Sequence, residues 1–350
     1  MNITVHQRPG VYSSYDASSV VSGSGGGKMV GLAAVNTAAQ AGEVHIITSY
    51  DKAVTVFGSE GEMAELVRLA LKNGASAVAA AAAADGSGYQ AAFDALNATE
   101  DISVLICDST SVEVQQKLRD SAAQASQTRR ERIAVVAGAK DESVDALIAR
   151  AAELNHERVV LVAPGAVDGQ GASASGLWVA AAVAGVIAGE SDPAVPLGGA
   201  ELLGLHGLAL NYEDKDLDRL ILGVVTPVEQ VGGAVTVVRG ITTRTTTGGA
   251  ADSTWRELST IRIVDDVIPA LRSALRSKFR RAKNTEQSRG AIRAQVVLEL
   301  ENKLAREIIT GYENVAVTAD SEDPTRCLVD FSFTVAHGLN QIWLTAHITV

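Results

Sequence analysis

Aromatic residues, cysteines and positive charge are all scarce in this chain of 350 residues, and each scarcity excludes a class of protein. Aromatics make up 4% of the residues although hydrophobic residues make up 47%, which favours closely packed α/β layers over aromatic ligand pockets. The two cysteines, Cys107 and Cys327, are too few for a disulfide scaffold and lack metal-ligand spacing. The formal net charge of -11 argues against nucleic-acid binding, which needs a basic field.

Long hydrophobic runs are missing as well. Residues 1–10 contain no basic segment followed by an apolar core, so we expect no signal peptide. The longest apolar stretch, Leu177–Ala188, spans about twelve residues and is too short to cross a bilayer. We therefore expect a soluble protein without membrane insertion, assembled in a reducing cytoplasm and holding no cofactor or metal.

What the chain does contain, from about Lys28 to Arg244, is an alternation of apolar runs and amphipathic stretches. Continuous apolar strands separated by helices predict a mainly parallel sheet covered on both faces, an α/β domain. The expected strands are Met29–Val35, Val44–Thr48, Val54–Phe57, Ser76–Ala82, Ile102–Cys107, Ile133–Ala137 and Val159–Ala163, with Thr226–Val231 and Ala234–Thr242 antiparallel about Gly232-Gly233. The expected helices are Glu60–Lys72, Tyr89–Asn97, Val112–Gln127, Ser143–Leu154 and Ser173–Gly189.

The pattern changes after Thr242–Asp252, a segment rich in Thr and Gly that we interpret as a hinge. An α+β C-terminal domain is predicted beyond it, with long helices at Ile261–Phe279 and Glu286–Ile309 and strands at Asn314–Ala319 and Leu328–Ala336. The predicted organisation is an extended arm and linker at 1–24, the α/β domain at 25–248, the C-terminal domain at 249–339 and a strand-like arm at 340–350.

Both ends of the chain have strand spacing. Ile3 and Val5 alternate with polar residues near the start, and Ile342, Leu344, Ala346 and Ile348 alternate with other residues near the end. A terminal strand must pair with the edge of a sheet. That edge can belong to its own domain or to a neighbouring subunit, and the pattern alone does not decide between them.

Three segments carry a resemblance to a known family. Arg8-Pro9-Gly10-Val11-Tyr12, the stretch from Thr226-Pro227 to Ile241-Thr242, and Ser259–Asp265 follow one another in the order found in tail sheath proteins of contractile phage tails. The chain resembles the short sheaths of Gram-positive phages and defective prophages. Its middle domain is similar to their non-catalytic subtilisin-like domain. No single motif is specific to the family; the ordered set of segments is.

The resemblance implies a structural protein and not an enzyme. Such sheaths stack as hexameric rings around an inner tail tube, between a baseplate and a tail terminator protein, in a virion tail or a phage-tail-like particle. Their terminal arms add strands to the C-terminal sheets of neighbouring subunits. By position, the donated strands would contain Ile3, Val5, Ile342, Leu344, Ala346 and Ile348, and the accepting strands Val315, Val317, Val329, Phe331 and Phe333.

A basic segment stands out from the acidic chain. Residues 271–293 hold eight basic groups and one acidic group, a local net charge of +7. In the family, C-terminal helices face the inner tube, which assigns inner-tube contact to Arg272, Arg276, Lys278, Arg280, Arg281 and Lys283. A solvated connection between helices, or contact with another partner, remains open as an alternative.

Several patterns suggest chemistry without meeting its requirements. Residues 23–28 resemble a phosphate loop but lack the Gly and the Ser or Thr that such a loop requires. Residues 171–176 resemble a nucleophile elbow, but the Gly-x-Ser-x-Gly pattern fails at Ser175. Ser173 is therefore interpreted as the N-cap of the following helix. Asp108 could be a site carboxylate at the sheet edge, but Asp108-Ser109 capping the next helix is favoured. Trp255 and Trp343 are predicted to lie at inter-subunit contacts. The alternatives to a sheath are a hydrolase-like α/β enzyme with an oligomerising C-terminal domain and a small-ligand-binding module.

Overall fold

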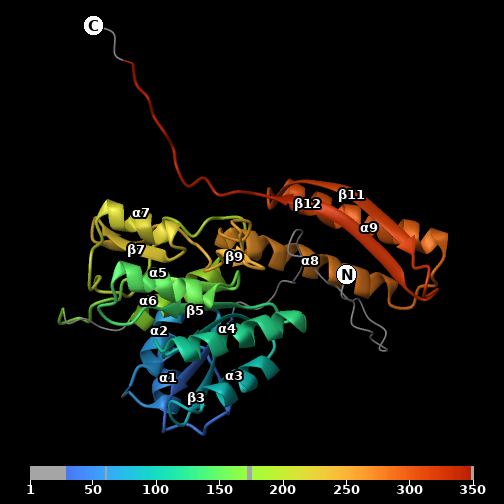
Figure 1. Cartoon of the computed structure of the whole chain (residues 1–350). Helices are drawn as coiled ribbons and strands as arrows, with labels where there is room; N and C mark the ends of the chain where they lie inside the picture. The colour runs from blue at the N-terminus through green and yellow to red at the C-terminus, as the bar shows by residue number, and fades with distance from the viewer. Residues whose placement is uncertain (1–28, 60, 172–175, 348–350) are drawn as a thin grey trace.

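The structure, a computed structural model, describes residues 29–59, 61–171 and 176–347 (Figure 1). An α/β domain comes first and a smaller C-terminal domain follows. The strands are Met29–Val35 (β1), Val44–Ile47 (β2), Ala77–Ala83 (β3), Ile102–Cys107 (β4), Ile133–Ala137 (β5), Val159–Ala163 (β6), Thr226–Val231 (β7), Ala234–Val237 (β8), Thr246–Thr247 (β9), Ala250–Ala251 (β10), Ile309–Ala319 (β11) and Cys327–Val335 (β12). The helices are Tyr50–Phe57 (α1), Met63–Lys72 (α2), Tyr89–Ala98 (α3), Val112–Gln127 (α4), Val144–Leu154 (α5), Gly176–Gly189 (α6), Asp214–Leu222 (α7), Leu258–Phe279 (α8) and Glu286–Ala305 (α9).

The α/β domain is built on an eight-stranded sheet in the order β2-β3-β1-β4-β5-β6-β7-β8. The six inner strands of this order, β3-β1-β4-β5-β6-β7, are parallel to one another, and β2 and β8 run antiparallel at the two edges. Helices α2 and α6 pack with the core on one face, and α3, α4 and α5 with the core on the other. Because both faces are covered, strands such as β3, Ala77–Ala83, are buried along their whole length. The predicted mainly parallel α/β fold is confirmed.

Three elements of the α/β domain differ from the prediction. The strand expected at Ala234–Thr242 ends at Val237. Val54–Phe57 was expected to be a strand but is the end of helix α1, whose N-cap Ser49 accepts a hydrogen bond from the Lys52 N–H. The buried side chains of α1, Ala53 and Phe57, lie four residues apart, which is helical spacing. Helix α7 was not predicted, because its sequence is short and rich in Asp.

The C-terminal domain consists of α8, α9 and the antiparallel hairpin β11–β12, which lies over α9 (Figure 1). Its core contains Ile263 and Leu271 of α8, Val296 and Leu300 of α9, and Ile309 at the start of β11. The prediction carried the second helix on to Ile309, whereas α9 ends at Ala305 and a strand begins at Ile309. The predicted α+β domain is otherwise confirmed.

Several predictions fall outside the described residues. They include the N-terminal arm with Ile3 and Val5, the glycine-rich segment at residues 23–28, Ser173 and Ile348. Cys107 is buried, as its apolar strand indicated. Within the part of the chain that the structure describes, no helix is long and apolar enough to span a bilayer.

Candidate assembly site and domain junction

The hairpin of the C-terminal domain is a sheet of only two strands within the described residues, so the outer edges of β11 and β12 both lack a strand partner there. The β12 edge is regular, with side chains that alternate between half-buried and exposed over Cys327–Val335. The β11 edge is interrupted by register shifts, one of them at Asn314, whose φ is 56°. An edge of unpaired backbone N–H and C=O groups is a template for another strand.

The five predicted acceptor residues lie together on this hairpin. Val315, Val329, Phe331 and Phe333 pack onto the core formed by α8 and α9, and Phe331 and Phe333 stack with ring centroids 6.2 Å apart. Val317 is paired with Val329 across the hairpin. The inner face of the sheet is therefore closed by its own domain, and only its edges are open to a partner.

The C-terminal arm makes no strand pairing within the described chain. It runs away from the domain into open space (Figure 1). Ile342 is 81% exposed and Leu344 is 90% exposed, as is Trp343. Exposed apolar residues in a row, at strand spacing, are a liability in an isolated subunit and are typical of a segment that pairs with another molecule.

The root of this arm lies against the α/β domain of its own chain. A side-chain carbon at Gly338 would come within 2.7 Å of the Pro196 Cβ atom, so glycine allows the close approach. Asn340 and Gln341 then line a pocket of about 260 Å³ together with α7. The direction in which the arm leaves the C-terminal domain is thus set by contacts with the α/β domain.

The basic segment forms the end of the α8–α9 helix pair. Arg276, Lys278, Arg280, Arg281 and Lys283 are exposed, and we call these five residues the basic tip. Arg272 lies apart from them, because its guanidinium pairs with Glu131 of the α/β domain at 3.4 Å and its side chain is 12% exposed. The tip is therefore exposed in the single chain, although Lys278 also donates to Gln295, whereas Arg272 is half-buried and paired with Glu131.

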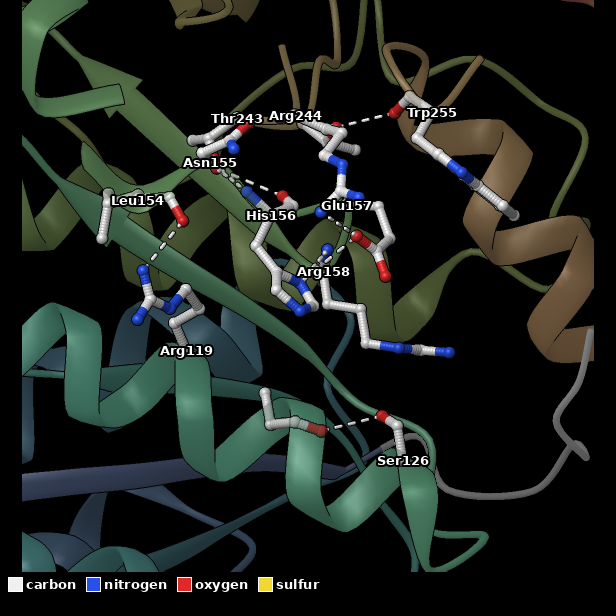
Figure 2. Close-up of polar contacts among 12 residues, drawn as sticks. Arg119, Ser126, Leu154, Asn155, His156, Glu157, Arg158, Thr243, Arg244 and Trp255 are labelled. Atoms are coloured by element: carbon white, nitrogen blue, oxygen red, sulfur yellow. Dashed lines mark hydrogen bonds and ion pairs between the residues drawn. The ribbon is translucent and has the colours of Figure 1, made fainter. Parts of the chain in front are cut away.

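The segment predicted to be a hinge, Thr242–Asp252, is held by hydrogen bonds over residues 242–246. Asn155, at the end of α5, accepts hydrogen bonds from the backbone N–H groups of Thr245 (2.9 Å) and Thr246 (3.1 Å). Thr243 donates through its backbone N–H to Val159 at 2.8 Å and exchanges hydrogen bonds with His156 through its hydroxyl (Figure 2). Thr242 donates through its hydroxyl to the Trp255 carbonyl at 2.7 Å. The segment is a fixed strap, held by residues about 90 positions away in sequence.

Trp255 belongs to this same arrangement and not to an exposed surface. Its side chain is 3% exposed and packs in the main core of the α/β domain. The prediction that it lies at an inter-subunit contact is therefore wrong. Trp343 is exposed on the arm, and its predicted contact stays a prediction.

A buried ion pair joins the two domains. The guanidinium of Arg158, directly before β6, donates to both carboxylate oxygens of Asp265 on α8, at 2.6 and 2.9 Å. Their side chains are 4% and 14% exposed. Burial raises the pKa of Asp265, and the opposing Arg158 guanidinium offsets part of that rise. On the same helix Arg262 donates to the backbone carbonyls of residues 190, 192 and 195, which holds the start of α8 on the α/β domain.

His156 lies inside this junction, with Glu157, Arg158, Arg244 and Arg119 around it (Figure 2). Its Nδ1 atom accepts a hydrogen bond from the Arg158 N–H at 3.1 Å, which requires an unprotonated Nδ1. Burial lowers the pKa of His156, and the three guanidiniums lower it further, while Glu157 acts in the opposite direction. The pKa of His156 is therefore lowered, which favours the neutral imidazole.

A pH-dependent loss of stability follows from His156. Because its folded pKa is lowered, its contribution to stability is present above the ordinary histidine pKa of about 6.5 and is lost as the pH falls below that value. In the His156→Asn variant the side-chain oxygen can still accept from Arg158, but nothing titrates. Urea unfolding at pH 7 and pH 5 should show a smaller loss of unfolding free energy for the variant than for the parent protein, and equal losses would contradict this account.

The carboxyl ends of β1 and β4 form the switch point of the sheet, where α/β enzymes commonly bind ligands. Here Asp108 fills that position. It accepts from the backbone N–H of Val35 at 2.8 Å and from the Tyr89 hydroxyl at 2.5 Å, so the prediction that it caps the next helix is wrong. Burial raises the pKa of Asp108, and burial together with the Asp108 charge raises that of Glu62. In the described ranges, no group of three or more His, Cys, Asp or Glu is placed to hold a metal ion.

Sequence reasoning did not find the junction. Asp265 stands inside a segment that was singled out for its resemblance, but its partner Arg158 lies 107 residues earlier, and Asn155 lies about 90 residues before the threonines that it holds. No periodicity or motif marks such pairs. An Arg directly before a buried strand was the available signal.

Comparison with known proteins shows which family has this architecture. The central domain of the phage tail sheath protein matches residues 75–243, and the phage tail sheath C-terminal domain matches residues 250–349. A tail sheath protein of Bacillus phage SP01 is 30% identical over 254 residues, and the chain spans 43% of that relative's length. The contracted helical sheath of the anti-feeding prophage aligns with a TM-score of 0.72 over 98% of this chain and 99% of that one, at 16% identity. A sheath tail protein of Desulfitobacterium hafniense gives a TM-score of 0.69 over 93% of this chain and all of that one, at 12% identity.

The fold, an α/β domain joined to a C-terminal α+β domain, is that of the solved sheath proteins. The two matched domains together extend over most of the chain. The chain belongs to the contractile tail sheath family.

Proposed function

We propose that the chain is the structural subunit of a contractile sheath. Subunits would form hexameric rings that stack helically around an inner tube, and contraction of the stack would drive the tube through a target envelope. The observation that carries the proposal is the open two-stranded hairpin beside an exposed apolar arm, in a chain of the sheath family. The site of action would be a virion tail or a phage-tail-like particle, with assembly in the bacterial cytoplasm and a baseplate and tail terminator at the two ends.

Strand exchange would hold the subunits together. Ile342, Leu344 and Ala346 share one face of the extended C-terminal arm and would lie in a neighbour's sheet. Ile348 of the same arm, and Ile3 and Val5 of the N-terminal arm, would also lie in the sheet of a neighbour. Strand addition supplies affinity through main-chain hydrogen bonds and register through alternating side chains. The hairpin strands that contain Val315, Val317, Val329, Phe331 and Phe333 would accept these arms at their outer edges.

A helical reconstruction of assembled protein tests strand exchange directly. We expect the β11–β12 sheet of each subunit to contain additional strands contributed by other chains. A sheet that keeps two strands in the assembly, with the arms elsewhere, would show that subunits associate by another route.

The basic tip would face the inner tube. Within the described chain its five side chains are exposed at the free end of the α8–α9 pair, in a protein whose net charge is -11. The triple variant Arg280→Gln, Arg281→Gln, Lys283→Gln should co-sediment less with inner tube protein, and the difference should shrink as salt is raised, because exposed charges are screened. Assembly of the sheath alone should be unchanged.

A matched control removes the same charge elsewhere. The residues Lys117, Lys140 and Lys215 are exposed on the α/β domain, and their replacement by Gln should leave co-sedimentation with the tube unchanged. Equal losses in the two triple variants would mean that net charge, and not the tip, governs binding. No loss in the tip variant would support the alternative that the tip is only a solvated connection.

An enzymatic role is disfavoured by the same structure. In a hydrolase-like α/β enzyme the switch point would present reactive groups to a substrate. Here the Asp108 carboxylate accepts hydrogen bonds from the Val35 N–H and from the Tyr89 hydroxyl, so both of its oxygens already have partners within the chain. We therefore propose that the α/β domain acts as a rigid body.

A further inference from the structure

The sequence of the C-terminal arm allows it to pair with the hairpin of its own chain. Strand β12 ends at Val335, and six residues, 336–341, separate it from Ile342 on the arm. A connection of about six residues is an ordinary length between neighbouring elements. If the chain turned back over these residues, the arm would run antiparallel along the outer edge of β12, which has no strand partner within the described residues.

The side-chain patterns of the arm and of β12 match in this arrangement. Placing Ile342 opposite Val335 brings apolar residues of the two strands together on the face that packs onto the C-terminal core. The apolar pairs are Ile342 with Val335, Leu344 with Phe333 and Ala346 with Phe331. Cross-strand pairs of this kind stabilise a sheet, and a short tether supplies an effective concentration in the millimolar range. An unrestrained arm would therefore close on its own hairpin.

The structure shows a different course for the arm. Beyond β12 the arm leaves the hairpin and runs away from it (Figure 1). At the root of the arm, a Cβ atom at Gly338 would lie 2.7 Å from the Cβ atom and 2.9 Å from the Cγ atom of Pro196. Asn340 and Gln341 then lie at the pocket beside α7. We call Pro196 and the α7 residues that line this pocket the arm seat, the latter being Asp214, Leu217, Asp218 and Ile221.

The arm seat belongs to a fixed part of the α/β domain. The carbonyl of Val195, next to Pro196, accepts a hydrogen bond from Arg262 of α8 at 3.2 Å. Leu197, on the other side of Pro196, is buried in one core of the domain, and Leu220 of α7 is buried in the other. A root held on such a surface is directed away from the edge with which the arm would otherwise pair.

We propose that the arm seat prevents the C-terminal arm from pairing with the β12 edge of its own chain. A self-paired arm would occupy its own acceptor edge and withdraw one donor strand and one acceptor edge at once. An arm held on the seat leaves both available to neighbouring subunits, and this consequence rests on the proposed sheath function. The choice between a seated and a self-paired arm is a property of the single chain and can be measured without assembly.

Single-molecule energy transfer on the full chain, at concentrations too low for association, distinguishes the two positions of the arm. Dyes are attached at Gln287→Cys, near the start of α9, and at Thr345→Cys on the arm, both exposed positions. Cys327 is replaced by Ser, and the buried Cys107 is kept. Each chain then carries two accessible thiols for labelling.

A self-paired arm would bring the two dyes closer together. The start of α9 lies beside the end of the hairpin at which β12 begins, since Asn284 donates to the Arg326 carbonyl at 3.2 Å. An arm antiparallel to β12 runs toward that end, so the parent protein, with its arm on the seat, should give one population of low transfer efficiency. Gly338→Ala places a methyl group against Pro196 and should add a population of higher efficiency, with about a tenth of the molecules or more.

Matched variants separate the seat from other effects of the substitution. Gly311→Ala adds the same methyl group on β11, where nothing lies within 4 Å, and should leave a single population of low efficiency. Adding Pro196→Gly to Gly338→Ala removes the ring atoms that the new methyl group would meet, so the second population should shrink. Adding Leu344→Pro to Gly338→Ala should abolish it, because proline removes a backbone donor and is poorly tolerated in a paired strand.

The proposal would be overturned by a parent protein that already populates the high-efficiency state, or by an unchanged distribution in Gly338→Ala. A second population that survives Leu344→Pro or Pro196→Gly, an equal one in Gly311→Ala, or loss of native circular dichroism in Gly338→Ala would overturn it as well. Light scattering at higher concentration tests the sheath function separately. If the second population appears as expected but the parent protein never assembles, the seat stands and the sheath function fails. If the parent protein assembles and Gly338→Ala shows no second population, the seat fails and the sheath function stands.

Discussion

Removal of residues 342–350 should abolish assembly and leave a folded monomer. The described part of this arm, up to residue 347, makes no strand pairing with the rest of the chain, and Ile342 and Leu344 are 81% and 90% exposed, so their loss removes no core packing. If the arm is the strand that a neighbouring hairpin accepts, its loss removes a row of main-chain hydrogen bonds from every subunit contact. We expect the apparent mass in light scattering to fall from that of a polymer to that of one chain.

Thermal unfolding followed by circular dichroism provides the control for this truncation, and the midpoint should stay within a few degrees of the parent protein. A point variant narrows the cause further. Leu344→Pro removes a backbone donor from the arm and should also block assembly, whereas Thr345→Ser should assemble normally. A truncated chain that still forms tubes would rule out a requirement for the C-terminal arm.

Asp265→Ala should destabilise the isolated subunit by about 3–5 kcal/mol, the range measured when one partner of a buried ion pair is removed. The change leaves the Arg158 guanidinium, whose side chain is 4% exposed, without its bidentate carboxylate. The pair also joins α8 to the α/β domain, so we expect the loss to be cooperative across both domains. Urea unfolding followed by far-UV circular dichroism measures it.

An exposed ion pair on the same domain is the matched control. Asp145 pairs with Arg219, but their side chains are 82% and 46% exposed, and Asp145→Ala should change the unfolding free energy by about 1 kcal/mol or less. The double variant Arg158→Met, Asp265→Leu should recover much of the stability lost in Asp265→Ala, because it leaves no unpaired buried charge. Equal effects of Asp265→Ala and Asp145→Ala would contradict a special role for the junction.

Much of the α/β domain could be predicted because its strands are buried on both faces. Runs such as Ile102–Cys107, Ile133–Ala137 and Val159–Ala163 have the bounds that were expected for them. Val54–Phe57 was assigned wrongly because four residues are too few to distinguish strand from helical spacing, and the decisive contacts of Ala53 and Phe57 start one residue earlier. The end of α9 at Ala305 was predicted less well because no Gly or Pro stands between it and the strand that begins at Ile309.

The features of the candidate site were also predictable from the sequence only in part. Alternation in the sequence puts the five predicted acceptor residues on two strands, and the structure places all five on one hairpin. The strap at residues 242–247, the core position of Trp255 and the pairing of Arg158 with Asp265 depend on tertiary contacts between distant segments. A Thr- and Gly-rich segment looks flexible by composition, but its hydroxyl and amide groups become fixed when a residue such as Asn155 is placed beside it.

Electron microscopy of the purified protein at rising concentration tests the central claim most directly. A sheath subunit should form hollow tubes or six-membered rings, and the fraction assembled should rise with concentration. A protein that remains monomeric at every concentration, with its fold intact, would contradict the proposal that this chain assembles itself into a sheath.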